Sequence, residues 1–203
     1  MTDWVVTNIF YVFETLGICT FAISGLLLAK EKDFDPVGVY IIAFVTALGG
    51  GTIRDLLLGE TPIYWISKVE YPLLILLLTA IIYPLSKERI HPSWLVVPDA
   101  IGLSLFTVTA VETALSVNLS PLIVMILGTI SACFGGLLRD ILCQEVPLIF
   151  QKVSFYSFVA FVGAGIFIAL RQVAVLSAYS SFITIAFIIS FRLLSYRYNW
   201  RFR

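Results

Sequence analysis

Apolar segments of about 20 residues dominate the sequence and constrain its fold more than any other feature. Short polar breaks such as KEKDFD and SVNLS separate them. A bilayer has a hydrocarbon core about 30 Å thick, which about 20 apolar residues cross as a helix. The pattern predicts seven transmembrane helices, at Ile9–Ala29, Pro36–Leu58, Ile66–Leu85, Trp94–Ser116, Pro121–Leu142, Ser154–Leu170 and Ser177–Leu194.

Composition agrees with this prediction. Of the 203 residues, 60% are hydrophobic and 13% are charged, whereas soluble domains are about 45–50% apolar and about 25% charged. We therefore expect an all-α integral membrane protein with residues 1–203 forming a single transmembrane domain. The net charge of zero gives no support for a nucleic-acid partner. No nucleophile–base pair or metal-ligand cluster is recognisable, so we predict no enzyme activity, no metal site and no cofactor.

A motif inside the second apolar segment recurs inside the fifth. GGTIRDLLLGETP begins at Gly50 and GGLLRDILCQEVP begins at Gly135, an offset of 85 residues. The same offset pairs further positions: Pro36 with Pro121, Phe21 with Phe106, Gly17 with Gly102, Glu14 with Asp99, and Tyr71 with Tyr156. We therefore predict that a unit at residues 9–85 is repeated at residues 94–170, and that a seventh helix at residues 177–194 is extra.

Each repeat unit contains three spans, so the second unit is expected to cross the membrane in the opposite direction. Inverted repeats with glycine-interrupted helices at matching positions indicate a permeation site near the middle of the bilayer. The direction of the first helix follows from the loop charges, because cytoplasmic loops carry the excess of Lys and Arg. One side carries only Lys68 and Arg171. The other side carries Lys30, Lys32, Lys87, Arg89, Lys152, Arg192, Arg197, Arg201 and Arg203. This bias predicts an external N-terminus and a cytoplasmic C-terminus.

The glycines of the motif allow two interpretations. Those in question are Gly49, Gly50, Gly51, Gly135 and Gly136. Small residues spaced by four favour close helix packing. A kink or unwound turn would instead direct backbone carbonyls toward a water-filled path. Three consecutive glycines exceed what packing alone requires, so we expect a break in the second helix.

Charged residues follow the glycines, where charge in a membrane is costly. Arg54 and Arg139 each precede an aspartate, Asp55 and Asp140. Neighbouring residues point about 100° apart on a helix, so we do not expect the adjacent Arg and Asp to pair. Glu14 and Asp99 are the expected partners of the two arginines. If all are ionised the balance is minus two, which favours cations in the pathway. Alternatively, these charges are salt bridges that lock the bundle.

The doubled glycine–Arg-Asp motif and the three-plus-three-plus-one layout resemble the prokaryotic branch of the trimeric intracellular cation (TRIC) channel family, which is also labelled a glycine-transporter domain family. The resemblance extends from about Glu14 to the last span. It implies a homotrimer in a prokaryotic inner membrane, in contact with lipids, with one pore in each protomer. It also implies that helices 1, 2, 4 and 5 line the pore, that the glycines bend helices 2 and 5, and that Arg54 and Arg139 face the pore.

Three functions remain open at this point, of which the weakest is a lipid-interacting scaffold that transports nothing. The first is a channel for monovalent cations, chiefly potassium, as the resemblance implies. The second is a secondary transporter for glycine or another small solute, because an arginine beside an aspartate at a broken helix could bind a carboxylate and an amine.

Overall fold

The computed structural model describes residues 2–85, 94–151, 155–198 and 200, and every regular element in them is helical. The elements are α1 (Thr2–Glu31), α2 (Pro36–Leu58), α3 (Glu70–Ile82), α4 (Val96–Ser116), α5 (Pro121–Leu142), the short 3₁₀ helix η3 (Leu148–Phe150), α6 (Tyr156–Gln172), α7 (Ala174–Ser177) and α8 (Ser180–Arg197). The predicted all-helical membrane fold is confirmed at this level.

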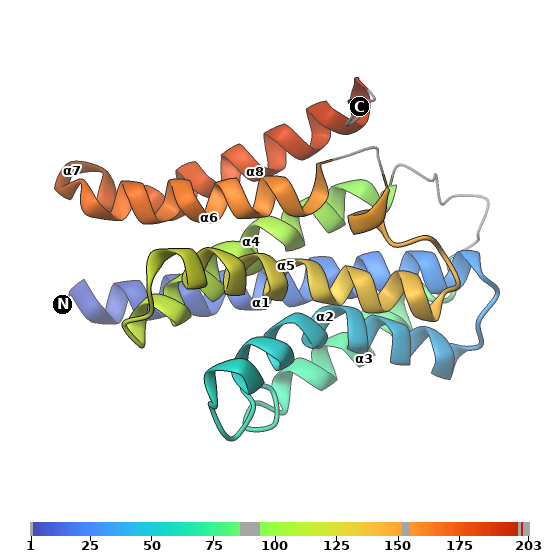
Figure 1. Ribbon diagram of the computed structural model, residues 1–203. Helices are drawn as coiled ribbons and strands as arrows, with labels where there is room; N and C mark the ends of the chain where they lie inside the picture. The colour runs from blue at the N-terminus through green and yellow to red at the C-terminus, as the bar shows by residue number, and fades with distance from the viewer. Residues whose placement is uncertain (1, 86–93, 152–154, 199, 201–203) are drawn as a thin grey trace.

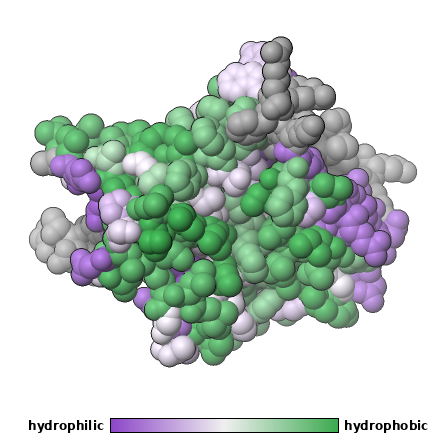
Figure 2. All heavy atoms as spheres, viewed as in Figure 1, coloured by the Kyte–Doolittle hydropathy of each residue, from purple (hydrophilic) through white to green (hydrophobic). Residues whose placement is uncertain are grey.

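Five of the described helices are long and apolar enough to cross a bilayer, namely those in α1, α2, α4, α5 and α8. The predicted spans at 66–85 and 154–170 contain shorter helices, because α3 has 13 residues and α6 has 17. At about 1.5 Å per residue, α3 covers only about 20 Å. Apolar side chains form a broad band around the middle of the visible face, and polar ones gather toward its two ends (Figure 2).

Local sequence explains how the second helix begins and ends. Asp35 accepts a hydrogen bond from the Gly38 amide at 2.6 Å, and Pro36 occupies the first turn, where a missing N–H costs nothing. Gly59 ends α2 with a φ of 72°, in the left-handed region that glycine adopts readily. Pro121 likewise occupies the first turn of α5, although the side chain of the preceding Ser120 makes no capping hydrogen bond.

Helices α1, α2, α4 and α5 form the centre of the bundle (Figure 1). Helix α3 packs on α1 and α2, while α6 and α8 pack on α4 and on each other. Helix α1 begins at one end of the bundle, and α8 ends at the other (Figure 1). Of the loop residues used to predict orientation, Lys87, Arg89, Lys152, Arg201 and Arg203 lie outside the described residues.

The motif glycines allow α2 and α5 to cross with their backbones in contact. A Cβ atom added at Gly50 would collide with the carbonyl oxygen of Ser131, and one at Gly135 would collide with that of Thr46. Ser131 also donates a hydrogen bond from Oγ to the Gly50 carbonyl at 3.1 Å. The 85-residue offset relates Gly50 to Gly135 and Thr46 to Ser131, so these two contacts are equivalent and the two motifs pack against each other symmetrically.

The expected unwound turn at Gly49–Gly51 is wrong, because α2 is helical without interruption from Pro36 to Leu58. The close-packing interpretation explains Gly50 and Gly135. Gly51 has a different neighbour, since a Cβ there would collide with the ring of Tyr64. The glycine run therefore accommodates neighbours on two faces of one continuous helix, which is why it is longer than a single crossing needs.

We predict that Gly50→Ala and Gly135→Ala destabilise the protein by about 1–3 kcal/mol, the usual cost of forcing atoms into a packed core. Gly49→Ala is the matched control, because its nearest neighbour is the flexible end of Leu138, 3.1 Å from the added Cβ. Thermal unfolding in detergent measures the difference. If Gly49→Ala were the damaging change and Gly50→Ala were neutral, close backbone packing would not be the role of these glycines.

Candidate functional site

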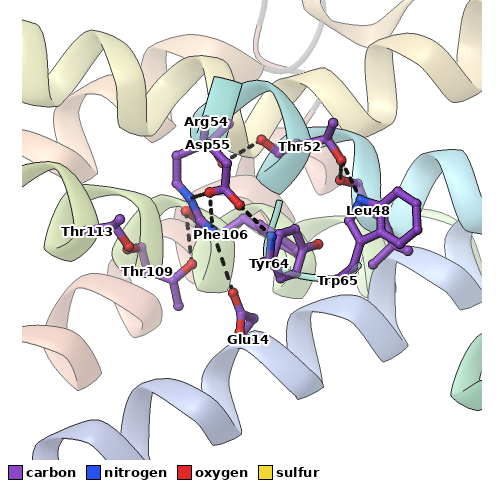
Figure 3. Close-up of polar contacts among 12 residues, drawn as sticks. Glu14, Leu48, Thr52, Arg54, Asp55, Tyr64, Trp65, Phe106, Thr109 and Thr113 are labelled. Atoms are coloured by element: carbon purple, nitrogen blue, oxygen red, sulfur yellow. Dashed lines mark hydrogen bonds and ion pairs between the residues drawn. The ribbon is translucent and has the colours of Figure 1, made fainter. Parts of the chain in front are cut away.

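Arg54 lies at the centre of the first charged cluster, near the end of α2. Its Nε donates to Asp55 Oδ1 at 2.8 Å, and its Nη2 lies 3.8 Å from Glu14 Oε1 on α1. The guanidinium also lies over the Tyr64 ring, 5.3 Å from the centroid. Figure 3 shows Glu14 reaching from α1 toward Arg54, with Thr109 of α4 nearby. The predicted partnership of Arg54 with Glu14 is present, although its distance is longer than that of a hydrogen-bonded pair.

Glu14 has two further partners from the segment around the start of α3. Lys68 Nζ lies 3.3 Å from Glu14 Oε2, and the Tyr71 hydroxyl donates to the same oxygen at 2.9 Å. The side chain of Lys68 is 35% exposed and that of Glu14 is 14% exposed. This cluster is therefore accessible from outside the bundle.

Arg139 forms the equivalent cluster in the second unit. Its Nε donates to Asp140 Oδ1 at 2.8 Å, and its Nη1 donates to Asp99 Oδ1 at 2.8 Å. Nη1 also donates to the hydroxyl of Ser24 on α1. The second oxygen of Asp99, Oδ2, lies 3.5 Å from Arg192 Nη2 on α8. The side chains of Arg139 and Asp99 are both 0% exposed, so the predicted pair is present and dry.

The expectation that adjacent Arg and Asp do not pair is wrong in both clusters. An arginine stem is long enough to turn its planar guanidinium back toward a neighbouring carboxylate. The loop that follows each helix then holds the carboxylate in place. Asp55 Oδ2 accepts from the Tyr64 amide at 2.9 Å, and Asp140 Oδ2 accepts from the Leu148 amide at 3.0 Å. The angle of about 100° describes the directions in which neighbouring side chains leave the helix, and it takes no account of their length.

Sequence reasoning missed Lys68 and Arg192, because it assigned the first to a loop and the second to the basic tail. Each places a second cation beside the carboxylate on α1 or α4. With these two added, the formal balance of minus two for the embedded charges becomes zero. The signal for Arg192 was its position inside the apolar run FIISFRLL, since an arginine within a membrane helix needs a partner.

A cavity of about 550 Å³ reaches the Arg54 cluster from one end of the bundle. Its walls carry four charged side chains, Glu14, Arg54, Lys68 and Glu112, with other lining residues Phe10, Tyr11, Thr109, Thr113 and Ser116. Glu112 forms an ion pair with Arg171 at 2.8 Å. In the part of the chain that the structure describes, no group of three or more His, Cys, Asp or Glu side chains could hold a metal ion.

At the opposite end of the bundle, the loops that follow α1 and α5 meet in a partly exposed ion pair. Beyond Arg139, the loop after α1 contacts the loop after α5, where Lys32 donates to the Glu145 carboxylate. This hydrogen bond is the main reason that the pKa of Lys32 is raised. Burial raises the pKa of the neighbouring Cys143 thiol to about 11. The two clusters are thus alike in residues and unlike in exposure, because the first borders a cavity while Arg139 and Asp99 are 0% exposed.

Comparisons with known proteins agree with this doubled architecture. The family model described as Glycine transporter matches the chain twice, at residues 11–87 and 96–172, with the offset of the doubled motif. A TRIC trimeric intracellular cation channel orthologue from Rhodobacter sphaeroides has the same fold. Its TM-score is 0.86 at 33% identity, and the likeness covers 95% of this chain and all (100%) of that one. The chain belongs to the TRIC family.

Other TRIC relatives extend the likeness. A prokaryotic TRIC channel solved in KCl has a TM-score of 0.88 at 28% identity, covering 97% of this chain and 100% of that one. A UPF0126 membrane protein of Vibrio cholerae serotype O1 is 40% identical over 86% of this chain and 72% of its own length. The UPF0126 inner membrane protein YadS of Escherichia coli K12 is 38% identical over 70% of this chain and 69% of its own length.

We predict that Arg139→Ala destabilises this TRIC protein by about 3–5 kcal/mol, because it leaves Asp99 and Asp140 as buried charges without their main partner. Arg54→Ala should cost less, since water in the cavity can hydrate Glu14. Arg171→Ala, in a partly exposed pair, is the control and should cost about 0–1 kcal/mol. Unfolding in detergent measures all three. Equal losses for Arg54→Ala and Arg139→Ala would contradict the assignment of one wet and one dry cluster.

Proposed function

We propose that this protein is a channel for monovalent cations, chiefly potassium, with a pathway among α1, α2, α4 and α5. The observation that carries the proposal is the charged cavity that enters the bundle and ends at Arg54. Beyond it lies a second cluster of matching residues around Arg139. Charged side chains inside a membrane bundle mark ion pathways. The likeness to solved TRIC cation channels supports the same function.

The cation preference does not rest on net charge, because the four charged side chains on the cavity wall sum to zero. We propose that it rests on the placement of carboxylate oxygens. Glu14 of α1 and Glu112 of α4 both lie on the wall of the cavity. A ring of such oxygens can replace part of the hydration shell of a cation. Arg54, at the inner end of the cavity, would then set how easily a cation passes.

The arrangement of the pathway follows from the doubled unit. We propose that the units at 9–85 and 94–170 are inverted repeats, that α2 and α5 bend at the motif glycines without unwinding, and that the active form is a homotrimer with one pore per chain. We further propose an external N-terminus, which places the cavity on the outer face, because the cavity lies where α1 begins and α4 ends. The lysines and arginines of the loops support that orientation.

Purified protein in lipid vesicles should carry potassium down its gradient, with stepwise currents in a planar bilayer that reverse near the potassium potential. Arg54→Ala should change the single-channel conductance, whereas Arg171→Ala should change it little. Native mass spectrometry should detect three copies of the 22.6 kDa chain. Saturable uptake of labelled glycine without any potassium current would contradict the channel and favour a carrier.

A further inference from the structure

We propose that Asp99 is a binding site for the permeant cation and that the Arg192 guanidinium occupies this site as a tethered counter-ion. This inference rests on the proposed channel function. It attributes closure of one half of the proposed pathway to the ion pair between Arg192 and Asp99. Arg192 belongs to α8, which lies outside the doubled unit and packs on α4 and α6. In this arrangement, the helix that follows the repeats supplies the residue that closes the pathway.

The carboxylate of Asp99 is held firmly by one oxygen and loosely by the other. Oδ1 accepts from Arg139 Nη1 at 2.8 Å and from the Tyr156 hydroxyl at 3.4 Å. Oδ2 has no hydrogen-bond partner among the described residues and lies 3.5 Å from Arg192 Nη2. Buried carboxylate oxygens are nearly always hydrogen-bonded, because leaving one unpaired is costly. An oxygen held only by a long ion pair is suited to exchange one cation for another.

Arg192 is held near Asp99 by an aromatic ring as well as by charge. Its guanidinium lies over the Tyr156 ring, 4.6 Å from the centroid, where a cation is favourable. A potassium ion carries the same single positive charge as the guanidinium. Replacing the guanidinium by potassium at Asp99 Oδ2 keeps one positive charge beside this carboxylate, so Asp99 stays compensated. The Arg192 guanidinium must leave the cluster as potassium enters, because a guanidinium that stayed would add one uncompensated positive charge.

The first unit shows what the same arrangement looks like when it is open. There Lys68 takes the position of Arg192, 3.3 Å from the equivalent carboxylate of Glu14. The side chain of Lys68 is 35% exposed, whereas that of Arg192 is 2% exposed. Both carboxylates are paired with an arginine and a second cation. The two sites therefore differ in exposure because their second cations belong to different parts of the fold. Lys68 comes from a peripheral segment and Arg192 from a packed helix.

The test uses a cysteine at Ser24, which is 0% exposed and accepts from Arg139. The three native cysteines, Cys19, Cys133 and Cys143, are first replaced in every variant, so that they cannot react with the reagent. A membrane-impermeant maleimide is added from the side where α1 and α5 end. We expect no labelling of Ser24→Cys alone, strong labelling when Arg192→Gln is added, and no labelling with the conservative Arg192→Lys. Lys68→Gln is the matched control and should leave Ser24→Cys unlabelled, because it acts at the other cluster.

A second measurement keeps the native Arg192, in case Arg192→Gln does not fold. Labelling of Ser24→Cys should rise with potassium and stay low in the same concentration of N-methyl-D-glucamine, which is too large to reach Asp99. Labelling that ignores potassium, or a folded Arg192→Gln variant that stays unlabelled, would overturn the proposal. Potassium flux through vesicles is measured in parallel and should rise several-fold with Arg192→Gln. Labelling as expected without any flux would support the site and reject the channel.

Discussion

The crossing of α2 and α5 is the contact on which the rest of the structure depends. Gly50 and Gly135 bring the two backbones together so closely that a Cβ on either would meet a carbonyl oxygen. Arg54 and Arg139 each follow their glycine by four residues, about one helical turn. The same crossing therefore places one arginine on each side of it, within reach of the carboxylates on α1 and α4. A looser crossing would leave both arginines far from Glu14 and Asp99.

The two charged clusters share their arginine–aspartate pairs and differ in the second cation. The arginine–aspartate pairs match almost atom for atom, with Nε to Oδ1 at 2.8 Å in both. Their second cations do not match, because Lys68 borders a cavity and Arg192 is enclosed by α4, α6 and α8. The Arg54 cluster thus borders an open cavity, while the side chains of Arg139 and Asp99 are fully enclosed. In the channel that we propose, this arrangement corresponds to a closed state with its closure on one side.

Much of this architecture could be predicted from sequence, because apolar segment length and the 85-residue offset are properties of the chain itself. The pairing of Arg54 with Glu14 and of Arg139 with Asp99 followed from the same offset. The contacts of Lys68 and Arg192 did not, because neither has an equivalent at that offset. The unwound turn was wrong because glycines in a row also suit a continuous helix with neighbours on two faces. Arg54 pairs with Asp55 through side-chain reach, which helix periodicity does not describe.

In the pathway that we propose, water enters from one end as far as Arg54 and Thr109 and stops there. A cysteine scan along α4, from Ser104 to Ser116, tests it with an impermeant thiol reagent added outside intact cells. Positions on the cavity wall, Thr109, Thr113 and Ser116, should react, whereas Ser104 and Thr107, both 0% exposed, should not. Reaction that continues to Ser104 from outside, or no reaction at Thr113 and Ser116, would contradict the account.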